Sequence, residues 1–153
     1  DIRKTGYALL LTEILNKVFH TEDKNEKLFV ELKKMIISFE HRPFNAVFGL
    51  FFIKEILTHF GIQPLNNFGI ENPYFNLADG KFSNNFDPNI EENFPHHILN
   101  KLLGTNIDDI FLFKINSTNR RLIMDLFLRY MSYHEIVNTD KLNSIKILQS
   151  LYD

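Results

Sequence analysis

Three arginines and an aspartate are the residues of this sequence best placed to do chemistry. Arg121, Asp125 and Arg129 follow one another at four-residue intervals, and Arg120 stands beside the first of them. Residues four apart lie on one side of a helix, so the set can form an ion ladder on a solvated surface, where each pair stabilises by a few tenths of a kcal/mol. The same arginines can instead face an anion, because a guanidinium offers planar, paired donors to a phosphate or an acidic peptide. Both interpretations are open at this point.

The remaining polar residues do not indicate catalysis or metal binding. His96 and His97 are adjacent, and neighbouring positions on a helix point roughly 100° apart, which is unsuited to binding one ion. We therefore expect solvated or capping histidines. Carboxylates gather in the middle of the chain, where we expect a solvated acidic loop rather than a cation site. They are Glu71, Asp79, Asp87, Glu91 and Glu92.

Cysteine is absent from the sequence. This excludes a disulfide framework, a cysteine-based zinc site and a thiol nucleophile, and it is typical of a reducing compartment. The sequence also has no glycine-rich phosphate loop, no nucleophile elbow and no paired-histidine metal motif. We therefore expect a protein that is not an enzyme and that has no metal, no cofactor and no small-molecule substrate.

Length and net charge further restrict the class of protein that this sequence can encode. The chain has 153 residues, enough for one domain, and a net charge of -2. Domains dedicated to DNA binding are usually basic, so any contact with nucleic acid must come from a local patch. The longest dense apolar run, residues 46–53, is too short to span a bilayer and is followed at once by Lys54. We expect a cytoplasmic domain with no membrane segment.

The elements that must position these residues are mostly helices. Residues 2–19 and the stretch that begins at Glu26 carry apolar residues at three- and four-residue spacing, the period of a helix with one buried side. Arg42-Pro43 ends the second helix, because proline lacks the amide hydrogen that a continuing helix needs. The predicted inward residues of that helix are Leu28, Leu32, Met35, Ile36 and Phe39.

A third helix is predicted over residues 45–60 and is apolar nearly all round, which favours a central, surrounded position. Gly61 follows as a residue able to take the left-handed conformation at the helix end. Residues 64–95 hold four of the five prolines and read as a loop. Inside it, two short strands flank Ala78-Asp79-Gly80 and form a hairpin. An isolated two-stranded hairpin is only marginally stable, so we expect this one to lie against the helices.

Helices return in the last third of the chain. One is predicted over residues 95–103, a second from a cap at Ser117 to about residue 134, and a closing one over residues 142–151. The sequence therefore predicts a mainly α fold: a single helical, bundle-like domain over residues 1–153 with a small inserted β-hairpin.

Several segments, taken together and in order, carry a family resemblance. They are residues 7–15 and 26–29 in the opening helices, 57–64 at the exit of the central helix, 75–82 in the hairpin, and 120–130 and 142–148 near the end. In this order they resemble the helical C-terminal domain of the bacterial recombination mediator family RecO, in a variety similar to that of Bacteroidetes-type bacteria. The family's N-terminal OB-fold is not in this sequence, so we expect the C-terminal portion of a longer protein.

The resemblance implies a DNA repair and recombination mediator that makes and breaks no chemical bond. It implies three partners: the ring-forming protein RecR, the acidic-hydrophobic tail of single-stranded-DNA-binding protein, and single-stranded DNA. It also implies a role in loading the RecA recombinase. A different class stays open, namely a helical scaffold that binds another protein and has no nucleic-acid role. The net charge favours the scaffold, whereas the order of the segments favours the mediator.

The chain departs from the family pattern at two places. Many members place four cysteines around the hairpin as a zinc ribbon, whereas this chain has none, so zinc is not expected. Many members also carry an arginine near the start of the central helix, where it can meet an acidic tail, and here only Lys54 lies near that region. The candidate residues for binding nucleic acid or an acidic peptide are therefore Arg120, Arg121, Arg129 and Lys54.

Overall fold

The computed structural model describes residues 1–19, 26–138 and 141–145. In chain order its elements are α1 (Ile2–Val18), α2 (Glu26–His41), α3 (Phe48–His59), β1 (Tyr74–Asn76), β2 (Lys81–Ser83), α4 (His96–Leu103), the short 3-10 helix η1 (Ile110–Leu112) and α5 (Ser117–Tyr133). The predicted mainly α fold with an inserted hairpin is confirmed. None of the helices described is both long and apolar enough to cross a bilayer.

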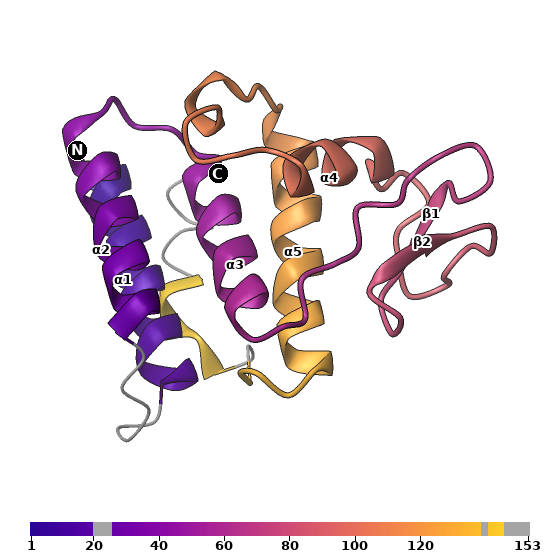
Figure 1. Ribbon diagram of the computed structural model, residues 1–153, viewed down its shortest axis with the longest axis horizontal. Coiled ribbons are helices and arrows are strands. Elements are labelled where there is room, and N and C mark those ends of the chain that lie inside the picture. Colours follow the sequence, from indigo (N-terminus) through magenta and orange to yellow (C-terminus); the bar gives the residue numbers. More distant parts are fainter. Residues whose placement is uncertain (20–25, 139–140, 146–153) are drawn as a thin grey trace.

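α1, α2, α3 and α5 stand roughly side by side, α4 lies across them, and the hairpin flanks the group (Figure 1). α1 and α2 lie together at one end of the long axis, α3 and α5 occupy the middle, and the hairpin lies at the opposite end. α3 is in contact with α1, α2, α5 and η1. The central position that the sequence predicts for this helix is therefore confirmed.

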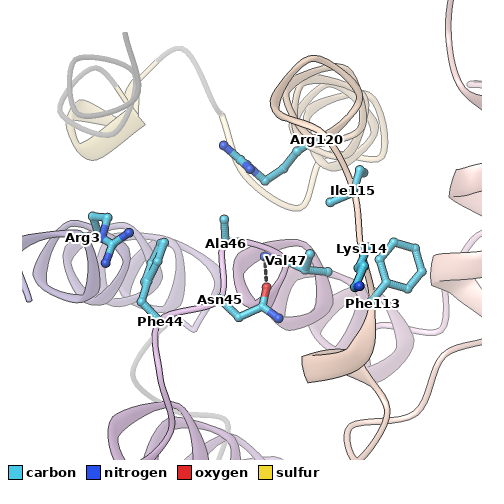
Figure 2. Close-up of a pocket in the computed structure, with 9 residues that line it drawn as sticks. All are labelled: Arg3, Phe44, Asn45, Ala46, Val47, Phe113, Lys114, Ile115 and Arg120. Carbon is cyan, nitrogen blue, oxygen red and sulfur yellow. Dashed lines mark hydrogen bonds between the residues drawn. The ribbon is translucent and has the colours of Figure 1, made fainter.

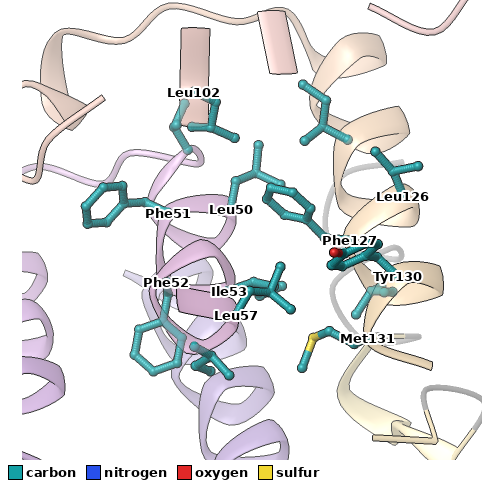
Figure 3. Close-up of a cluster of buried hydrophobic side chains, with 14 of the residues drawn as sticks. Leu50, Phe51, Phe52, Ile53, Leu57, Leu102, Leu126, Phe127, Tyr130 and Met131 are labelled. Atoms are coloured by element: carbon teal, nitrogen blue, oxygen red, sulfur yellow. The ribbon is translucent and has the colours of Figure 1, made fainter. Parts of the chain in front are cut away.

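The core is built around α3 because this helix is apolar nearly all round. Its side chains meet those of α5 and α4 in the cluster of Figure 3, where Ile53 and Leu57 of α3 point towards α5 and Phe52 points away from it. Burying each such large side chain contributes roughly 1.5–3 kcal/mol. The buried apolar residues of α3 are Phe48, Leu50, Phe51, Phe52, Ile53, Ile56 and Leu57.

α2 buries one stripe and exposes the next. The buried residues are Leu28, Leu32, Met35 and Phe39. Ile36, which the sequence pattern placed on the inward side, is 43% exposed, and that assignment is wrong. Positions 28, 32, 35 and 39 already form a complete seam at three- and four-residue spacing, and position 36 is turned roughly 100° from position 35.

The hairpin packs against the helices, as predicted, and the helix that it contacts is α5. Phe75 and Phe82 face each other across its two strands and are both buried. Gly80 closes the turn at φ +63°, a conformation that favours glycine. A Cβ at this position would lie 2.3 Å from the hydroxyl of Tyr130, so the turn and α5 approach as closely as a glycine permits.

The prediction of a solvated acidic loop is wrong for Asp87, which is buried. Its carboxylate is buried and accepts hydrogen bonds from the backbone N–H groups of Leu77, at 2.8 Å, and Asn89, at 2.9 Å. Burial alone would raise the pKa of Asp87, but these hydrogen bonds and the nearby Arg129 outweigh it and lower the pKa. This aspartate therefore holds the loop to the hairpin.

His96 also has a structural partner. Its Nδ1 accepts the backbone N–H of Phe75 at 3.0 Å, which joins the start of α4 to the hairpin. Burial, with a smaller contribution from the neighbouring His97, lowers the pKa of His96. A neutral ring is the form that can accept this hydrogen bond.

α5 begins one residue earlier than the predicted cap implies. Asn116, not Ser117, caps the helix, and its side-chain oxygen accepts the N–H of Asn119 at 2.8 Å. Asparagine and serine are comparable caps, so the pattern alone does not separate them. Of the closing helix predicted over residues 142–151, residues 143–145 are helical and the part beyond residue 145 lies outside the described residues.

Candidate functional site

A pocket of about 470 Å³ opens where the beginnings of three helices meet. It is formed by the first turn of α1, the segment that leads into α3, and the segment that leads into α5 together with the first turn of that helix (Figure 2). Its lining residues are Arg3, Phe44, Asn45, Ala46, Val47, Phe113, Lys114, Ile115 and Arg120. This volume is in the range of pockets that bind small ligands or peptide side chains.

Hydrogen bonds hold the wall of the pocket in place. Asn45 accepts the N–H of Val47 at 2.8 Å through its side-chain oxygen, which fixes the turn into α3 (Figure 2). The hydroxyl of Tyr7 donates to the carbonyl of Ala46 at 2.8 Å. Tyr7 in turn lies against Gly49, where a Cβ would come within 2.2 Å of its ring. The segment is therefore fixed by α1 and α3 before any ligand binds.

The pocket combines positive charge with apolar surface. Arg3, Lys114 and Arg120 supply three cations, and no carboxylate is among the lining residues. The guanidinium of Arg3 lies 4.5 Å from the ring centre of Phe44 and pairs with Asp1 at 2.7 Å, so a ligand at this cation has to compete with Asp1. Arg120 stands in the first turn of α5, where the helix dipole adds positive potential. Such a site can bind a carboxylate or a phosphate that has an apolar group attached.

Of the four predicted residues, the structure places Arg120 in this pocket and the other three elsewhere. Arg121 lies on the exposed side of α5 and is not among the lining residues. Arg121 and Arg129 both act on Asp125: burial raises the pKa of that carboxyl, and the two arginines partly offset the effect. The four-residue spacing predicted this coupling of Arg121 and Arg129 to Asp125.

Arg129 reaches across to the loop that precedes α4. Its guanidinium donates to the carbonyl of Asn89 at 2.6 Å and to both carboxylate oxygens of Glu91 at 3.0 and 3.1 Å. One guanidinium nitrogen serves both oxygens of Glu91 while the other bonds the Asn89 carbonyl, so the contact is a charge-assisted pair with a bifurcated donor. Arg129 thus anchors the loop on α5, and a ligand at this position would have to compete with Glu91.

Lys54 lies inside the helical bundle. It is 6% exposed, and its ammonium donates to the carbonyl of Thr105 at 2.7 Å and lies 3.4 Å from Glu55. Burial lowers the pKa of Lys54, while Glu55 acts in the opposite direction. The side chain also lies 4.4 Å from the ring centre of Phe51. Lys54 therefore joins α3 to the segment after α4.

Two of the cations that line the pocket were not predicted from the sequence. Arg3 and Lys114 come from opposite parts of the chain, and neither has a charged neighbour at helical spacing that would single it out. Among the described residues, no group of three or more histidines and carboxylates could hold a metal ion. The residues that line the pocket include no nucleophile with a base beside it.

Comparison with known proteins finds similarity to one family. The family described as Recombination protein O C terminal matches residues 1–70. The chain is 25% identical over 153 residues to DNA repair protein RecO of Flavobacterium psychrophilum, covering 99% of this chain and 63% of the relative. It is 30% identical over 152 residues to DNA repair protein RecO of Christiangramia forsetii, covering 97% of this chain and 62% of the relative. The resemblance to the RecO family is confirmed.

The similarity to RecO proteins runs along nearly the whole chain. DNA repair protein RecO of Azobacteroides pseudotrichonymphae is 26% identical over 155 residues, covering 98% of this chain and 63% of the relative. The chain thus spans a little over three fifths of the length of the curated relatives that it matches. No solved structure is significantly similar to it.

Proposed function

We propose that this chain is the helical portion of a non-catalytic DNA repair and recombination mediator, and that the pocket beside Arg120 binds an acidic, apolar peptide. The tail of single-stranded-DNA-binding protein is the peptide of this chemistry that the RecO resemblance implies. In this proposal the mediator works with RecR and single-stranded DNA in loading a recombinase, and this domain supplies a protein-binding site.

The observation that carries the proposal is the composition of the pocket. Arg3, Lys114 and Arg120 surround a surface that includes Phe44 and Phe113. Arginine binds carboxylates through paired, charge-assisted hydrogen bonds, and buried aromatic surface is the usual anchor for an apolar side chain. A peptide that carries both features satisfies the whole pocket, whereas a bare phosphate leaves the apolar part unused.

The charge of the chain does not favour strong binding of DNA. A net charge of -2 gives no long-range attraction to a phosphate backbone. Lys54 and Arg129 bind Thr105 and Glu91, so a phosphate at either cation would have to displace these partners. We therefore expect weak binding of single-stranded DNA by this chain, with a salt slope near ~-0.7 per phosphate contacted.

A peptide titration tests the assignment. The probe is a fluorescent peptide with a run of aspartates followed by two apolar residues and a free C-terminal carboxylate, and its anisotropy is followed at low and moderate salt. Arg120→Glu should weaken binding about 10- to 100-fold, because a hydrogen bond to a charged group contributes ~1.5–3 kcal/mol. Arg121→Glu is the matched control, since it makes the same charge change one residue away and outside the pocket.

Two results would contradict the proposal. Equal losses for Arg120→Glu and Arg121→Glu would mean that only the overall charge of α5 matters. Tight binding of a fluorescent single-stranded oligonucleotide, with no binding of the peptide, would make this domain the DNA-binding part of the mediator instead.

A further inference from the structure

The loop between α3 and the hairpin displays apolar side chains to solvent. Leu65 and Phe68 are exposed, and Ile70 is 100% exposed. Ile70 and Glu71 form the tip of a tight turn that is closed by two backbone hydrogen bonds between Gly69 and Asn72, at 3.0 and 3.3 Å. We call this tip, Ile70-Glu71, the knob.

The loop that carries the knob is fixed by the hairpin and by α4. The side chain of Asn67 exchanges hydrogen bonds with the N–H and the carbonyl of Phe82, at 2.8 and 2.9 Å. The N–H of Leu65 donates to the carbonyl of Gly80 at 2.7 Å, and the N–H of Phe68 donates to the side chain of Asn100 at 3.2 Å. A preordered surface loses little conformational entropy when it binds, so an exposed isoleucine here is well placed to act as an anchor.

Charge is divided unevenly between this region and the rest of the chain. Residues 62–95 contain five carboxylates and one lysine, which gives a net charge of -4. Because the whole chain carries -2, the remaining residues together carry +2. The knob therefore stands in the acidic part of a molecule whose other part is basic, and a low overall charge favours association between such parts.

The pocket beside Arg120 matches the knob in chemistry and lies at a distance from it. The pocket is framed by the starts of α1, α3 and α5, whereas the hairpin region lies at the far end of the long axis from α1 and α2 (Figures 1 and 2). The knob therefore cannot reach the pocket of its own chain. It can reach the pocket of a second chain. Both sites remain accessible in the described residues.

We propose that the knob of one chain binds in the Arg120 pocket of a second copy, so that the domain associates head to tail. Ile70 occupies the apolar part of the pocket beside Phe44, and Glu71 meets Arg120. The proposal rests on the pocket's proposed preference for an acidic, apolar segment, which the knob presents in the form of two adjacent residues. A head-to-tail contact leaves a free knob and a free pocket at the two ends, and it extends into chains or rings.

This association regulates the pocket, because a knob that occupies it excludes the acidic peptide. Peptide and second copy therefore compete for one site. A rising protein concentration should lower the apparent affinity for the peptide, and saturating peptide should return the protein to the monomer.

Sedimentation velocity at low salt, over a range of protein concentrations, tests the proposal. The unmodified chain should show an average mass that rises with concentration and falls when salt is added. Ile70→Ser, Glu71→Arg and Arg120→Glu should each weaken association about tenfold or more. The double variant Glu71→Arg with Arg120→Glu restores opposite charges at the contact and should associate more strongly than either single variant.

A mixture of the two single variants gives the sharpest result. The Arg120→Glu chain keeps an intact knob and the Glu71→Arg chain keeps an intact pocket, so the mixture should form dimers that neither forms alone and should not grow further. A chain that stays monomeric at all concentrations overturns the proposal, and so does association that is unchanged by Ile70→Ser and Glu71→Arg. Because Glu71→Arg leaves the pocket intact, that variant still reports peptide binding, and a failure of self-association is distinguished from a failure of the proposed function.

Discussion

Replacing Glu13 by glutamine should release the C-terminal segment from α1. The carboxylate of Glu13 accepts the backbone N–H groups of Asn143, at 2.9 Å, and Ser144, at 2.8 Å, and it also accepts the Ser144 hydroxyl. It therefore caps the helical turn that begins at Asn143 in the way that an N-cap residue does, although it comes from a distant helix. Glutamine keeps the shape of the side chain, but it removes the charge and one acceptor oxygen.

The size of the effect follows from the pKa of Glu13. Burial would raise this pKa, but the hydrogen bonds from Ser144 and Asn143, together with Lys17, lower it from 4.5 to about 2. At 1.36 kcal/mol per pH unit, this corresponds to roughly 3 kcal/mol. The side chain is 20% exposed, and solvent screening reduces the figure, so we expect a loss of about 2 kcal/mol at pH 7.

The pH dependence has a definite sign. A carboxyl group with a lowered pKa stabilises the fold fully above its unfolded value of 4.5, and the contribution is lost as the pH falls towards about 2. The difference between the parent and Glu13→Gln in urea unfolding should therefore be constant from pH 7 to about 5.5 and shrink to roughly half by pH 3. Glu31→Gln, an exposed glutamate on α2, is the matched control. Equal unfolding midpoints for the two variants at pH 7 would refute the capping account.

Two substitutions test the packing that positions the pocket and the hairpin. Phe52→Ala should lower the free energy of unfolding by ~3–5 kcal/mol, because Phe52 is fully buried on the central helix, and an unchanged melting temperature would make the role assigned to α3 wrong. Gly80→Ala should cost more than about 1 kcal/mol, since φ is +63° and the new Cβ would meet the Tyr130 hydroxyl. Gly69→Ala, at a position with open space around it, is the control, and equal losses in urea unfolding for the two glycines would contradict the packing of the hairpin on α5.

Local sequence patterns predicted the helices and turns that depend mainly on neighbouring residues. The central helix was predictable because apolar residues cover nearly its whole circumference. The hairpin was predictable because Asp79-Gly80 permits a tight turn. Ile36 shows the limit of this reasoning. An apolar residue beside a complete seam fits the pattern equally well, and only the packing of α2 against its neighbours decides that it is exposed.

The pocket could not be predicted because its residues meet only in three dimensions. Arg3 and Arg120 belong to different helices, and what joins them is the segment fixed by Tyr7 and Asn45. The burial of Lys54 and Asp87 was missed for a related reason. A charged residue is normally assigned to the surface, and the carbonyl of Thr105 and the N–H of Leu77, which make these two exceptions possible, meet Lys54 and Asp87 only in the folded chain.

The central claim is that an acidic, apolar peptide binds in the Arg120 pocket, and chemical-shift mapping of backbone amides tests it most directly. Titration of the isotope-labelled chain with the aspartate peptide should shift the amides of Val47 and Ile115, which line the pocket. The amides of Lys54 and Arg129, which lie away from it, should stay in place. Shifts centred on Lys54 or Arg129, with Val47 and Ile115 unchanged, would contradict the account.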